Sequence, residues 1–542
     1  MKALHIIAIA AAISFSLSCS DSLQIEQHGV TDLSNFYKTD EQVLQANAAN
    51  YTAFIVNPSN MNFNFLEQFE LYYITINTLL SDEAYAAGAA TRGGLARDEE
   101  INEFTFSSDN IAIQYYYAYM YAMINKANLV LDNTSEGQSE FVDMCRAESK
   151  FFRSWANFEL ATLWGTAPNV DHVLQGDEYQ VHNSEPGELW AQIEKDLSEA
   201  ISSGKLSEKK NVNDNKTWRV TKQLAQALLG KAYLWQNKYS EAASQFESVI
   251  SSGKYALLPT DDYENMWTNR NKFCCESMFE INRTLNMNNV NVGLPWRNFF
   301  WFTEVYTNLP PVVENTGSGS GAPRKDLYDA FVKHEGKDGK RLHQTLRTYS
   351  ELNKEYGMRM LNGSTSYQDS IFTWKTRLLP EHRGAYGYIT TTGNMHIMRY
   401  AEVLLLASEA QLMAGNNAKA IEYLNQVRRR AGLADLSSLT LNDIKTEKRL
   451  ELCYECVRYK DLLRWGDAYD VLKNQGESVP FFSVSYASAE SNDPSTDIKT
   501  VEYRKYHNDP SGFGFKKGKH ELLPFPAAET RANPNIVQNP GY

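Results

Sequence analysis

Apolar residues recur at three- and four-residue spacing along two long segments of the chain. Residues 111 to 132, IAIQYYYAYMYAMINKANLVLD, contain neither glycine nor proline, and residues 147 to 165 end at Gly165 with Pro168 just beyond. This period is that of a helix with one buried face, and the glycine and proline are stop signals. The pattern predicts two long helices whose tyrosines belong to a core.

A helical hairpin is predicted over residues 228 to 250, LLGKAYLWQNKYSEAASQFESVI. Its Leu229, Gly230, Tyr233, Ala242 and Phe246 fall at the spacing of a tetratricopeptide repeat, in which small residues let two helices approach closely. A second copy starts at Leu406, in a register displaced by 178 positions. One such hairpin cannot bury its own apolar face, so these dispersed units are expected to stack on other helices.

Two long segments have a different pattern. Residues 265 to 325 are rich in asparagine and include Trp267, Trp296 and Trp301, while residues 476 to 520 are dense in Ser, Asn, Asp, Gly and aromatic residues. Structureless loops of this length are uncommon in a compact domain unless they bind something or are disordered. We therefore predict that these segments are loops and that they carry function.

The N-terminus reads as an export signal. Lys2 is followed by an apolar run that ends on small and polar residues before Cys19, which is the pattern of a secretory signal peptide over residues 1 to 18. Two processing routes fit: a lipoprotein peptidase cutting before Cys19 after Ser18, or an ordinary signal peptidase using Ser16 and Ser18. The first makes Cys19 a lipid anchor, and the second leaves it the first residue of a soluble exported protein.

Composition and net charge restrict the classes of partner that the chain is expected to bind. The 542 residues carry a formal net charge of -13 with a pI near 5.4, which disfavours nucleic acid and attraction to a negative lipid surface. Any membrane attachment is therefore expected to be covalent or through a protein. Six cysteines are present, and the five that remain beyond Cys19 are an odd number, so they cannot all pair as disulfides.

No catalytic constellation, metal site or cofactor motif is recognised in the sequence. The CYEC stretch at 453 to 456 lies in a segment, 444 to 466, whose apolar spacing predicts a helix, so its thiols are expected to be buried there. Aromatic rings pack on the C–H faces of sugars, and Asn, Asp and Arg bind sugar hydroxyls. The mixtures of these residues at 80 to 85, around Trp267 and at 293 to 306 therefore suggest a glycan platform.

Three C-terminal stretches closely resemble the SusD/RagB family, the surface nutrient-binding lipoproteins of Bacteroidetes. They are MRYAEVLLLASEA (398 to 410), EKRLELCYECVRYKDLLRWG (447 to 466) and HELLPFPAAETRANPNIVQNPGY (520 to 542). The likeness continues upstream through residues 147 to 170 and 222 to 250 to CSDSL at 19 to 23. The chain departs from the family at Cys456, where the E-G-x-R stretch usually has glycine.

The resemblance implies a mainly helical, SusD-like fold with four dispersed tetratricopeptide-like helix pairs and an irregular, loop-rich ligand-binding region. It implies a lipid on Cys19, display on the outer membrane, a partner SusC-like TonB-dependent transporter, and a ligand that is generally an oligosaccharide or polysaccharide. On this basis the chain divides into a signal peptide (1–18), a tether and first helix start (19–40), an N-terminal helical region (41–260) and a C-terminal region with loop insertions (261–542).

Position and chemistry place the carbohydrate site on five residues: Asp82, Tyr85, Trp267, Trp296 and Trp301. The charged residues of the 447 to 466 stretch, Glu447, Arg449, Glu451 and Arg458, are expected to form structural ion pairs in the scaffold. Two other functions stay open from the sequence. One is a peptide-binding lipoprotein or a tetratricopeptide-type interaction scaffold, and the other, disfavoured by the lack of acid–base groups, is a secreted hydrolase.

Overall fold

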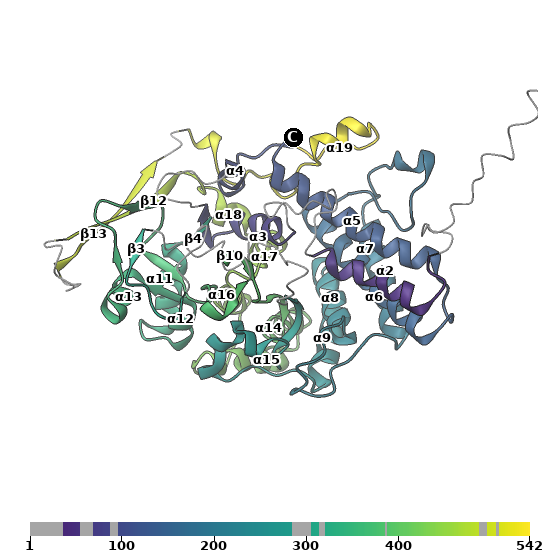
Figure 1. Ribbon diagram of the computed structural model, residues 1–542, viewed down its shortest axis with the longest axis horizontal. Coiled ribbons are helices and arrows are strands. Elements are labelled where there is room, and N and C mark those ends of the chain that lie inside the picture. Colours follow the sequence, from purple (N-terminus) through teal and green to yellow (C-terminus); the bar gives the residue numbers. More distant parts are fainter. Residues whose placement is uncertain are drawn as a thin grey trace, which may run out of the picture.

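The fold was analysed in a computed structural model of the chain, shown in Figure 1. The structure describes residues 36–54, 69–86, 96–283, 305–313, 320–384, 387–486, 496–505 and 509–542. Most of the described chain is helical, and one large hydrophobic core runs through it. A smaller apolar cluster lies under a three-stranded sheet.

Helices stack side by side through one half of the molecule (Figure 1). The stack divides into four pairs, α2/α5, α6/α7, α8/α9 and α14/α15, and the neighbouring pairs pack on one another, with α9 against α14. This arrangement confirms the predicted fold class. The bounds are α2 Asp40–Thr52, α5 Ile111–Asn133, α6 Glu140–Leu163, α7 Glu188–Ser202, α8 Lys222–Trp235, α9 Tyr239–Ser251, α14 Tyr400–Met413 and α15 Asn417–Arg430.

The helices predicted from the three- to four-residue spacing are present, and one is longer than expected. The helix predicted from residue 147 begins at Glu140, because the Ser139 side chain accepts a hydrogen bond from the Val142 backbone N–H and caps the first turn. Tyr116 and Tyr119 of α5 are fully buried, as the apolar pattern predicted. The aromatic run of α5 is therefore part of the core.

Close approach of α8 and α9 depends on Gly230. A Cβ atom placed on this residue would lie 2.7 Å from two ring carbons of Phe246, which is closer than side chains pack. In the second copy the equivalent position is Ser408, whose hydroxyl donates to the Ala420 carbonyl at 2.7 Å. The two hairpins thus share a register, but one brings its helices together through a glycine and the other through a serine that hydrogen-bonds to the facing helix.

We expect Gly230→Val to lower the free energy of unfolding by about 2–3 kcal/mol, because the branched side chain forces the Phe246 ring out of its position. Gly230→Ala should cost less, since alanine also gains helix propensity of about 1 kcal/mol over glycine. Urea unfolding followed by circular dichroism measures both. Equal stability of all three proteins would show that the helix pair does not need the small residue.

Shorter helices complete the α-structure. They are α3 Phe69–Leu79, α4 Ala96–Glu103, α11 Lys325–Glu335, α12 Lys340–Thr345, α13 Tyr349–Tyr356, α16 Leu441–Glu451, α17 Arg458–Trp465, α18 Ala468–Leu472 and α19 Ala527–Ala532. Single 3₁₀ turns are η1 Gly176–Tyr179, η2 Thr260–Trp267, η3 Asn269–Asn271, η4 Pro380–His382 and η6 Pro510–Gly512.

The strands are short and antiparallel. They are β1 Ala84–Ala86, β2 Ser277–Ile281, β3 Tyr306–Thr307, β4 Gly321–Pro323, β5 Leu346–Thr348, β6 Arg359–Met360, β7 Thr365–Ser366, β8 Ile371–Thr373, β9 Arg383–Gly384, β10 Gly387–Thr391, β11 Met395–Arg399, β12 Ser478–Ser485 and β13 Ile498–Lys505. Sheets form in the orders β1-β4, β11-β2, β13-β12-β7, β3-β6, β5-β8 and β10-β9. All these pairings are antiparallel.

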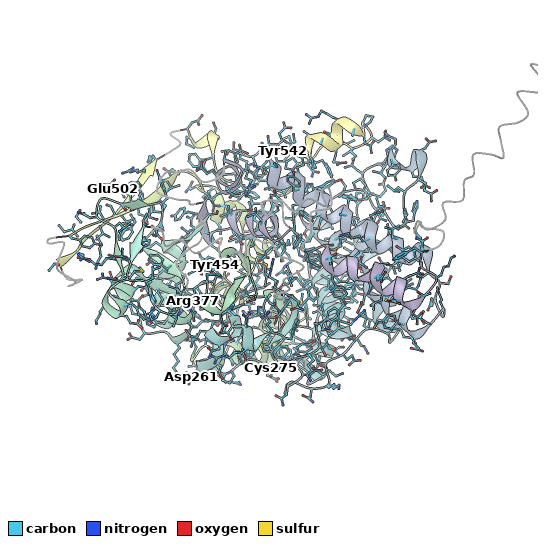
Figure 2. The ribbon with its side chains drawn as sticks, in the orientation of Figure 1. Asp261, Cys275, Arg377, Tyr454, Glu502 and Tyr542 are labelled. Carbon is cyan, nitrogen blue, oxygen red and sulfur yellow. The ribbon has the colours of Figure 1, made fainter. Side chains whose placement is uncertain are left out.

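The prediction of a structureless loop over residues 476 to 520 is wrong for much of its length. β12 and β13 pair from Ser478↔Lys505 to Ser485↔Ile498, and Glu502 lies at the edge of the molecule in Figure 2. Phe482 and Val484 of β12 are buried in the smaller cluster. Segment 265 to 325 likewise contains η2 and the buried strand β2.

A charged cluster lies inside the larger core, and we call it the ion-pair core. Glu451 contacts Arg399 (Oε1–Nη2, 3.0 Å), Arg341 (Oε2–Nη1, 3.1 Å) and Arg430, while Lys375 and Arg399 both pair with Glu455. Since unpaired charges are very costly inside a protein, these groups stabilise the fold only as a complete set. Its members are Glu276, Arg341, Lys375, Arg399, Arg430, Glu447, Glu451 and Glu455.

The apolar spacing predicted that the CYEC stretch lies within a helix, and this prediction is wrong. Helix α16 ends at Glu451 and α17 begins at Arg458, and in the turn between them Tyr454 and Cys456 have φ of 64° and 63°. Glycine adopts this left-handed conformation at no steric cost, which explains why the E-G-x-R motif suits the position of Cys456. Figure 2 places Tyr454 near the middle of the molecule.

The two CYEC thiols are buried, as expected. Cys453 donates to the Leu450 carbonyl (3.4 Å), and the Cys456 sulfur lies 3.7 Å from the Thr78 hydroxyl. Burial raises the pKa of the Cys453 thiol to about 12 and raises that of Cys456 as well. Because the thiolate is the reactive form, neither residue is suited to redox chemistry or metal binding at neutral pH.

Candidate functional site

A short ladder of two strands places Tyr85 next to Arg324. Strand β1 pairs with β4 through Ala84↔Pro323 and Tyr85↔Ala322, and the Arg324 backbone N–H donates to the Glu83 carbonyl at 3.2 Å. The Arg324 guanidinium carbon lies 4.5 Å from the centroid of the Tyr85 ring, which is a cation–π contact. Tyr85 is 8% exposed, and burial raises its pKa to about 12.

Strand β13 brings Tyr503 to the same place. Its hydroxyl donates to Asp369 Oδ1, and the other carboxylate oxygen of Asp369 accepts the Lys325 backbone N–H at 2.8 Å. Both Tyr85 and Arg324 influence the ionisation of Tyr503, whose pKa is raised mainly by burial and by Asp369. Yet Tyr503 is 48% exposed. Its ring is thus available on the surface while its hydroxyl is held.

We call Tyr85, Arg324, Asp369 and Tyr503 the Tyr85 site. It combines aromatic rings with a guanidinium and a carboxylate, which is the chemistry that binds the C–H faces and hydroxyls of a sugar. Of the four, only Tyr85 was singled out from the sequence. Tyr503 lies in the aromatic-rich segment 476 to 520, but no spacing rule could have paired it with Asp369, which is 134 positions away.

Asp82 lies behind Tyr85 and is committed to arginines. Its carboxylate makes a bidentate contact with Arg458 (2.7 and 3.0 Å) and a second contact with Arg449 (2.9 Å). Burial alone would raise the pKa of Asp82, but the two guanidinium charges outweigh burial and hold it below its usual range. Its geometry is that of a structural ion pair, so we assign Asp82 the role of positioning β1.

Trp267 is 2% exposed and lies in the core, at the end of η2. Lys375 Nζ and the Arg399 guanidinium lie 5.1 and 5.7 Å from its ring centroid, and the His396 ring meets it edge-on at 5.0 Å. A ring so enclosed offers little face to a sugar, so the geometry does not favour a ligand contact at Trp267, which stays a prediction. Trp296 and Trp301 lie outside the described residues, as does Cys19.

Four charged residues of the 447 to 466 stretch, Glu447, Arg449, Glu451 and Arg458, are ion-paired, as predicted. Glu447 contacts Arg341 at 2.7 Å and Arg428 at 3.2 Å. Arg449 joins Asp82 to Asp326 through two contacts of 2.9 Å. These residues hold α16 and the following turn against β1 and α11.

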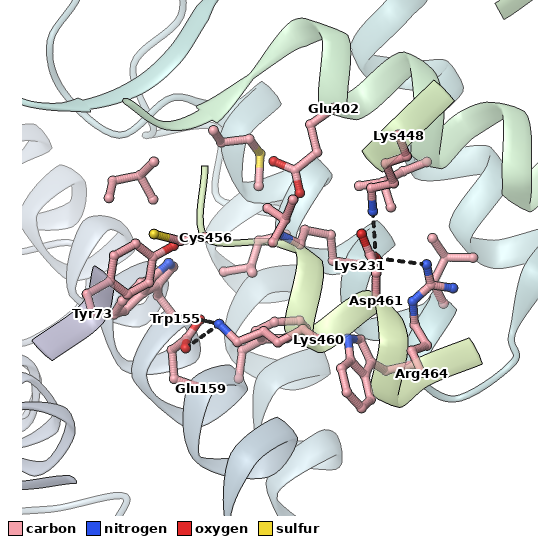
Figure 3. A pocket seen from close by; sticks show the side chains of 18 residues that line it. Tyr73, Trp155, Glu159, Lys231, Glu402, Lys448, Cys456, Lys460, Asp461 and Arg464 are labelled. Atoms are coloured by element: carbon pink, nitrogen blue, oxygen red, sulfur yellow. Dashed lines mark hydrogen bonds and ion pairs between the residues drawn. The ribbon is translucent and has the colours of Figure 1, made fainter. Parts of the chain in front are cut away.

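The enclosed pocket in Figure 3 is charged but too small for a sugar. Its volume is about 40 Å³, which is room for two or three water molecules at most. Lys460 is paired with Glu159, and Asp461 accepts from Lys448 at 2.7 Å and from Arg464 at 3.2 Å. This pocket is a small cavity lined by paired charges in the interior.

A buried histidine–glutamate pair joins β11 to β2. His396 Nε2 lies 3.0 Å from Glu280 Oε1. Burial acts to lower the pKa of His396, but the Glu280 carboxylate outweighs it and raises the pKa to about 9, and His396 in turn lowers the pKa of Glu280 to about 2. The pair is therefore charged at neutral pH.

This pair should make stability pH-dependent. The pKa of His396 is raised above its unfolded value near 6.5, so its contribution is fully present below pH 6.5 and is lost as the pH rises through about 9. We expect a loss on the order of 1–3 kcal/mol between pH 7 and 10. Urea unfolding at each pH should show this loss in the natural protein and a flatter profile in His396→Gln; identical slopes would contradict it.

Within the described ranges, no three His, Cys, Asp or Glu side chains come close enough together to hold a metal ion. No described helix is long and apolar enough to cross a membrane.

Comparisons with known proteins agree on one family. Residues 276–542 match the model of the SusD family, and residues 40–234 match a model described as starch-binding and associating with the outer membrane. A SusD-like protein of Formosa agariphila is 24% identical over 97% of both chains. A SusD-like protein of Bacteroides ovatus is 23% identical over 64% of both chains.

Solved structures share the fold. A laminarin-binding SusD-like protein superposes with a TM-score of 0.73 at 24% identity, covering 93% of this chain and all of the other. Surface glycan-binding protein A from Bacteroides thetaiotaomicron, in complex with laminarihexaose, gives a TM-score of 0.71 at 20% identity, covering 92% and 99% of the two chains.

Proposed function

Because the chain belongs to the SusD family, we propose that it captures an oligosaccharide or polysaccharide at the cell surface and delivers it to a SusC-like TonB-dependent transporter. The protein itself performs no catalysis in this proposal. The observation that carries it is the Tyr85 site, in which the half-exposed Tyr503, whose hydroxyl is held by the buried Asp369, lies beside the contact between Tyr85 and Arg324. A β-glucan of the laminarin type is the first ligand to test, since two relatives of the same fold are described with it.

The chemistry of the Tyr85 site suits weak binding of a flexible ligand such as a glycan. The half-exposed ring of Tyr503 can stack on a sugar, and the partly exposed guanidinium of Arg324 can donate to its hydroxyls, while the buried Asp369 holds the Tyr503 hydroxyl in place. The charges are tied to the scaffold by Asp326 and Lys325, so little conformational entropy is lost on binding. Trp296 and Trp301 remain proposed members of the same site.

Attachment to the outer membrane is proposed to be through a lipid on Cys19. Cys19 and Phe36 are 17 positions apart, so the segment that joins them can span at most about 60 Å. One acyl chain gives only marginal binding, so stable anchoring requires more than one. Mass spectrometry of the N-terminal peptide from native membranes tests this, and an unmodified Cys19 would contradict it.

Calorimetry of the mature chain with laminarin and a panel of other polysaccharides is the test of the function. We expect saturable binding to one class, and affinity at least about 10-fold weaker in Tyr503→Ala, Trp296→Ala or Trp301→Ala, because stacked aromatic anchors dominate such sites. Trp218→Ala removes another exposed aromatic, one that packs on Tyr51, and should leave binding unchanged.

Three outcomes would count against the proposal. Unchanged binding in the Tyr503 and tryptophan variants would move the site elsewhere. New reducing ends on incubation with the bound polysaccharide would indicate a hydrolase. Absence of binding across the panel by folded protein would favour the alternative of a peptide-binding lipoprotein or an interaction scaffold, and co-purification with a barrel transporter tests the partner separately.

A further inference from the structure

An apolar groove of about 340 Å³ lies between α5, the loop that joins α6 to α7, and the C-terminal tail with α19. In Figure 1, α19 lies above α5. Tyr117 and Tyr121 of α5 form one wall, and Ile536 and Tyr179 form others. Tyr179 is 63% exposed. A groove of this size and lining is within the range of ligand sites.

The groove is held open by hydrogen bonds between its loop and the tail. Asn533 Nδ2 donates to the Val181 carbonyl at 2.7 Å, and Asn535 Nδ2 donates to the Gln180 carbonyl at 2.9 Å. Asn183 exchanges two more hydrogen bonds with the Val537 backbone, at 2.8 and 3.1 Å. A preformed groove loses little entropy when it is filled.

Glu529 brings the only charged side chain among the described residues that line the groove. Burial raises its pKa, and its carboxyl influences the ionisation of both Tyr117 and Tyr121, so it lies near their hydroxyls. No described cation makes an ion pair with Glu529. A carboxylate beside an apolar groove without a cationic partner is a place where a ligand's positive charge is favoured.

The loop that joins α6 to α7 adds further negative charge around the groove. Residues 166–188 contain no lysine or arginine, and they contain five carboxylates: Asp171, Asp177, Glu178, Glu185 and Glu188. Exposed carboxylates of one sign attract a cationic segment from a distance and raise its association rate. A second copy of this chain is disfavoured as the occupant, because each copy carries a net charge of -13.

From these features we propose that the groove is a docking site for a basic segment of a partner protein. An aromatic or large aliphatic residue of that segment fills the groove between Tyr117, Tyr121 and Tyr179, and flanking lysines or arginines face Glu529 and the acidic loop. The site is separate from the Tyr85 site, and it goes beyond glycan capture: it is the surface through which the protein engages another protein.

The test uses a labelled heptapeptide, Lys-Lys-Ala-Trp-Ala-Lys-Lys, and fluorescence anisotropy with the mature chain at low salt. We expect saturable binding that weakens at 0.5 M NaCl, because exposed charges are screened there. A peptide with glutamates in place of the lysines, and one with alanine in place of tryptophan, should each bind at least about 10-fold more weakly, since both the anchor and the charges are needed.

Two variants locate the site. Glu529→Gln should weaken the basic peptide about 3- to 10-fold, in the range of a lost charge contact, and Ala532→Trp should abolish binding by filling the groove from an exposed position of α19. Glu422→Gln removes an equal, exposed charge from α15 and is the matched control. Circular dichroism checks that all three fold.

The proposal is overturned if the basic peptide does not bind at 1 mM, if the peptide without tryptophan binds equally well, or if Glu422→Gln weakens binding as much as Glu529→Gln. Equal weakening would mean unspecific attraction to an acidic protein. Binding of chitosan oligomers in the groove, lost in Ala532→Trp, with no binding of the peptide, would replace the protein partner by an amine-bearing glycan. Glycan calorimetry at the Tyr85 site is unaffected by any of these results, so the two proposals fail separately.

Discussion

Replacing Lys375 with methionine is expected to lower the free energy of unfolding by about 3–5 kcal/mol, which is the cost of removing one partner from a buried ion pair. The Lys375 ammonium is fully buried and donates to the carbonyls of Glu451 (3.1 Å) and Cys453 (3.0 Å) and to the Glu455 carboxylate. Methionine has a similar length but no charge or donor. It would leave the Cys453 carbonyl without this donor and Glu455 with Arg399 as its partner, while the Glu451 carbonyl would keep its hydrogen bond from Arg399 (3.2 Å).

The loss should be large because Lys375 holds a turn of unfavourable geometry. Tyr454 and Cys456 both have positive φ, a conformation that costs non-glycine residues on the order of 1 kcal/mol each and persists only where the surroundings impose it. Lys375 contacts the backbone on the N-terminal side of this turn. Without those contacts, the connection between α16 and α17 is expected to loosen together with the ion-pair core.

Urea unfolding followed by tryptophan fluorescence and circular dichroism measures this effect. Lys419→Met is the matched control, because Lys419 makes one ion pair, with Glu247, on the surface, and such pairs contribute little. A loss below about 1 kcal/mol in Lys375→Met would mean that water or a rearranged side chain replaces the ammonium, and the assigned role of Lys375 would be wrong.

Asp82→Asn is expected to lower the free energy of unfolding by about 2–4 kcal/mol. The change keeps the shape of the side chain but removes the charge that compensates Arg458, which is itself buried. A guanidinium left without its counter-ion inside a protein is strongly destabilising. Arg449 keeps its contact with Asp326, so the cost should be less than that of losing the whole cluster.

This variant also separates a structural role of Asp82 from a role in ligand binding. We expect reduced stability, and an unchanged glycan affinity of the protein that remains folded at low temperature. Asp470→Asn removes the charge of an exposed pair with Lys473 and should cost little. Unchanged stability with weakened glycan binding would return Asp82 to the ligand site and remove it from the scaffold.

Sequence pattern was sufficient for α5, most of α6 and the two hairpins α8/α9 and α14/α15, whereas the number of helix pairs was implied by the family resemblance. The three- to four-residue spacing of apolar residues in α5 and α6, and the small residues at Gly230 and Ser408, are local signals that act within one helix or between two neighbours in the chain. The family motifs of the C-terminal half pointed to the same fold. Such signals survive without knowledge of the tertiary structure because helix hydrogen bonds and hairpin contacts are short in sequence.

The predicted ligand contacts show what the pattern of a sequence cannot decide. Asp82 and Trp267 have the chemistry of sugar-binding residues, but the chain folds Arg458 against the first and Lys375 and Arg399 against the second. In contrast, Tyr503 was one aromatic among many in its segment. It joined the site because β13 pairs with β12 and brings its hydroxyl to Asp369.

The sequence by itself determined the helical class, the family, the two matched hairpins and the acidic charge of the chain. Only the tertiary structure decided which polar residues pair with one another and which remain available to a ligand. The physical reason is that burial and pairing of charges depend on contacts between segments tens to hundreds of residues apart, such as Asp82 with Arg458 and Val181 with Asn533. The composition and spacing of a single segment carry no record of such contacts.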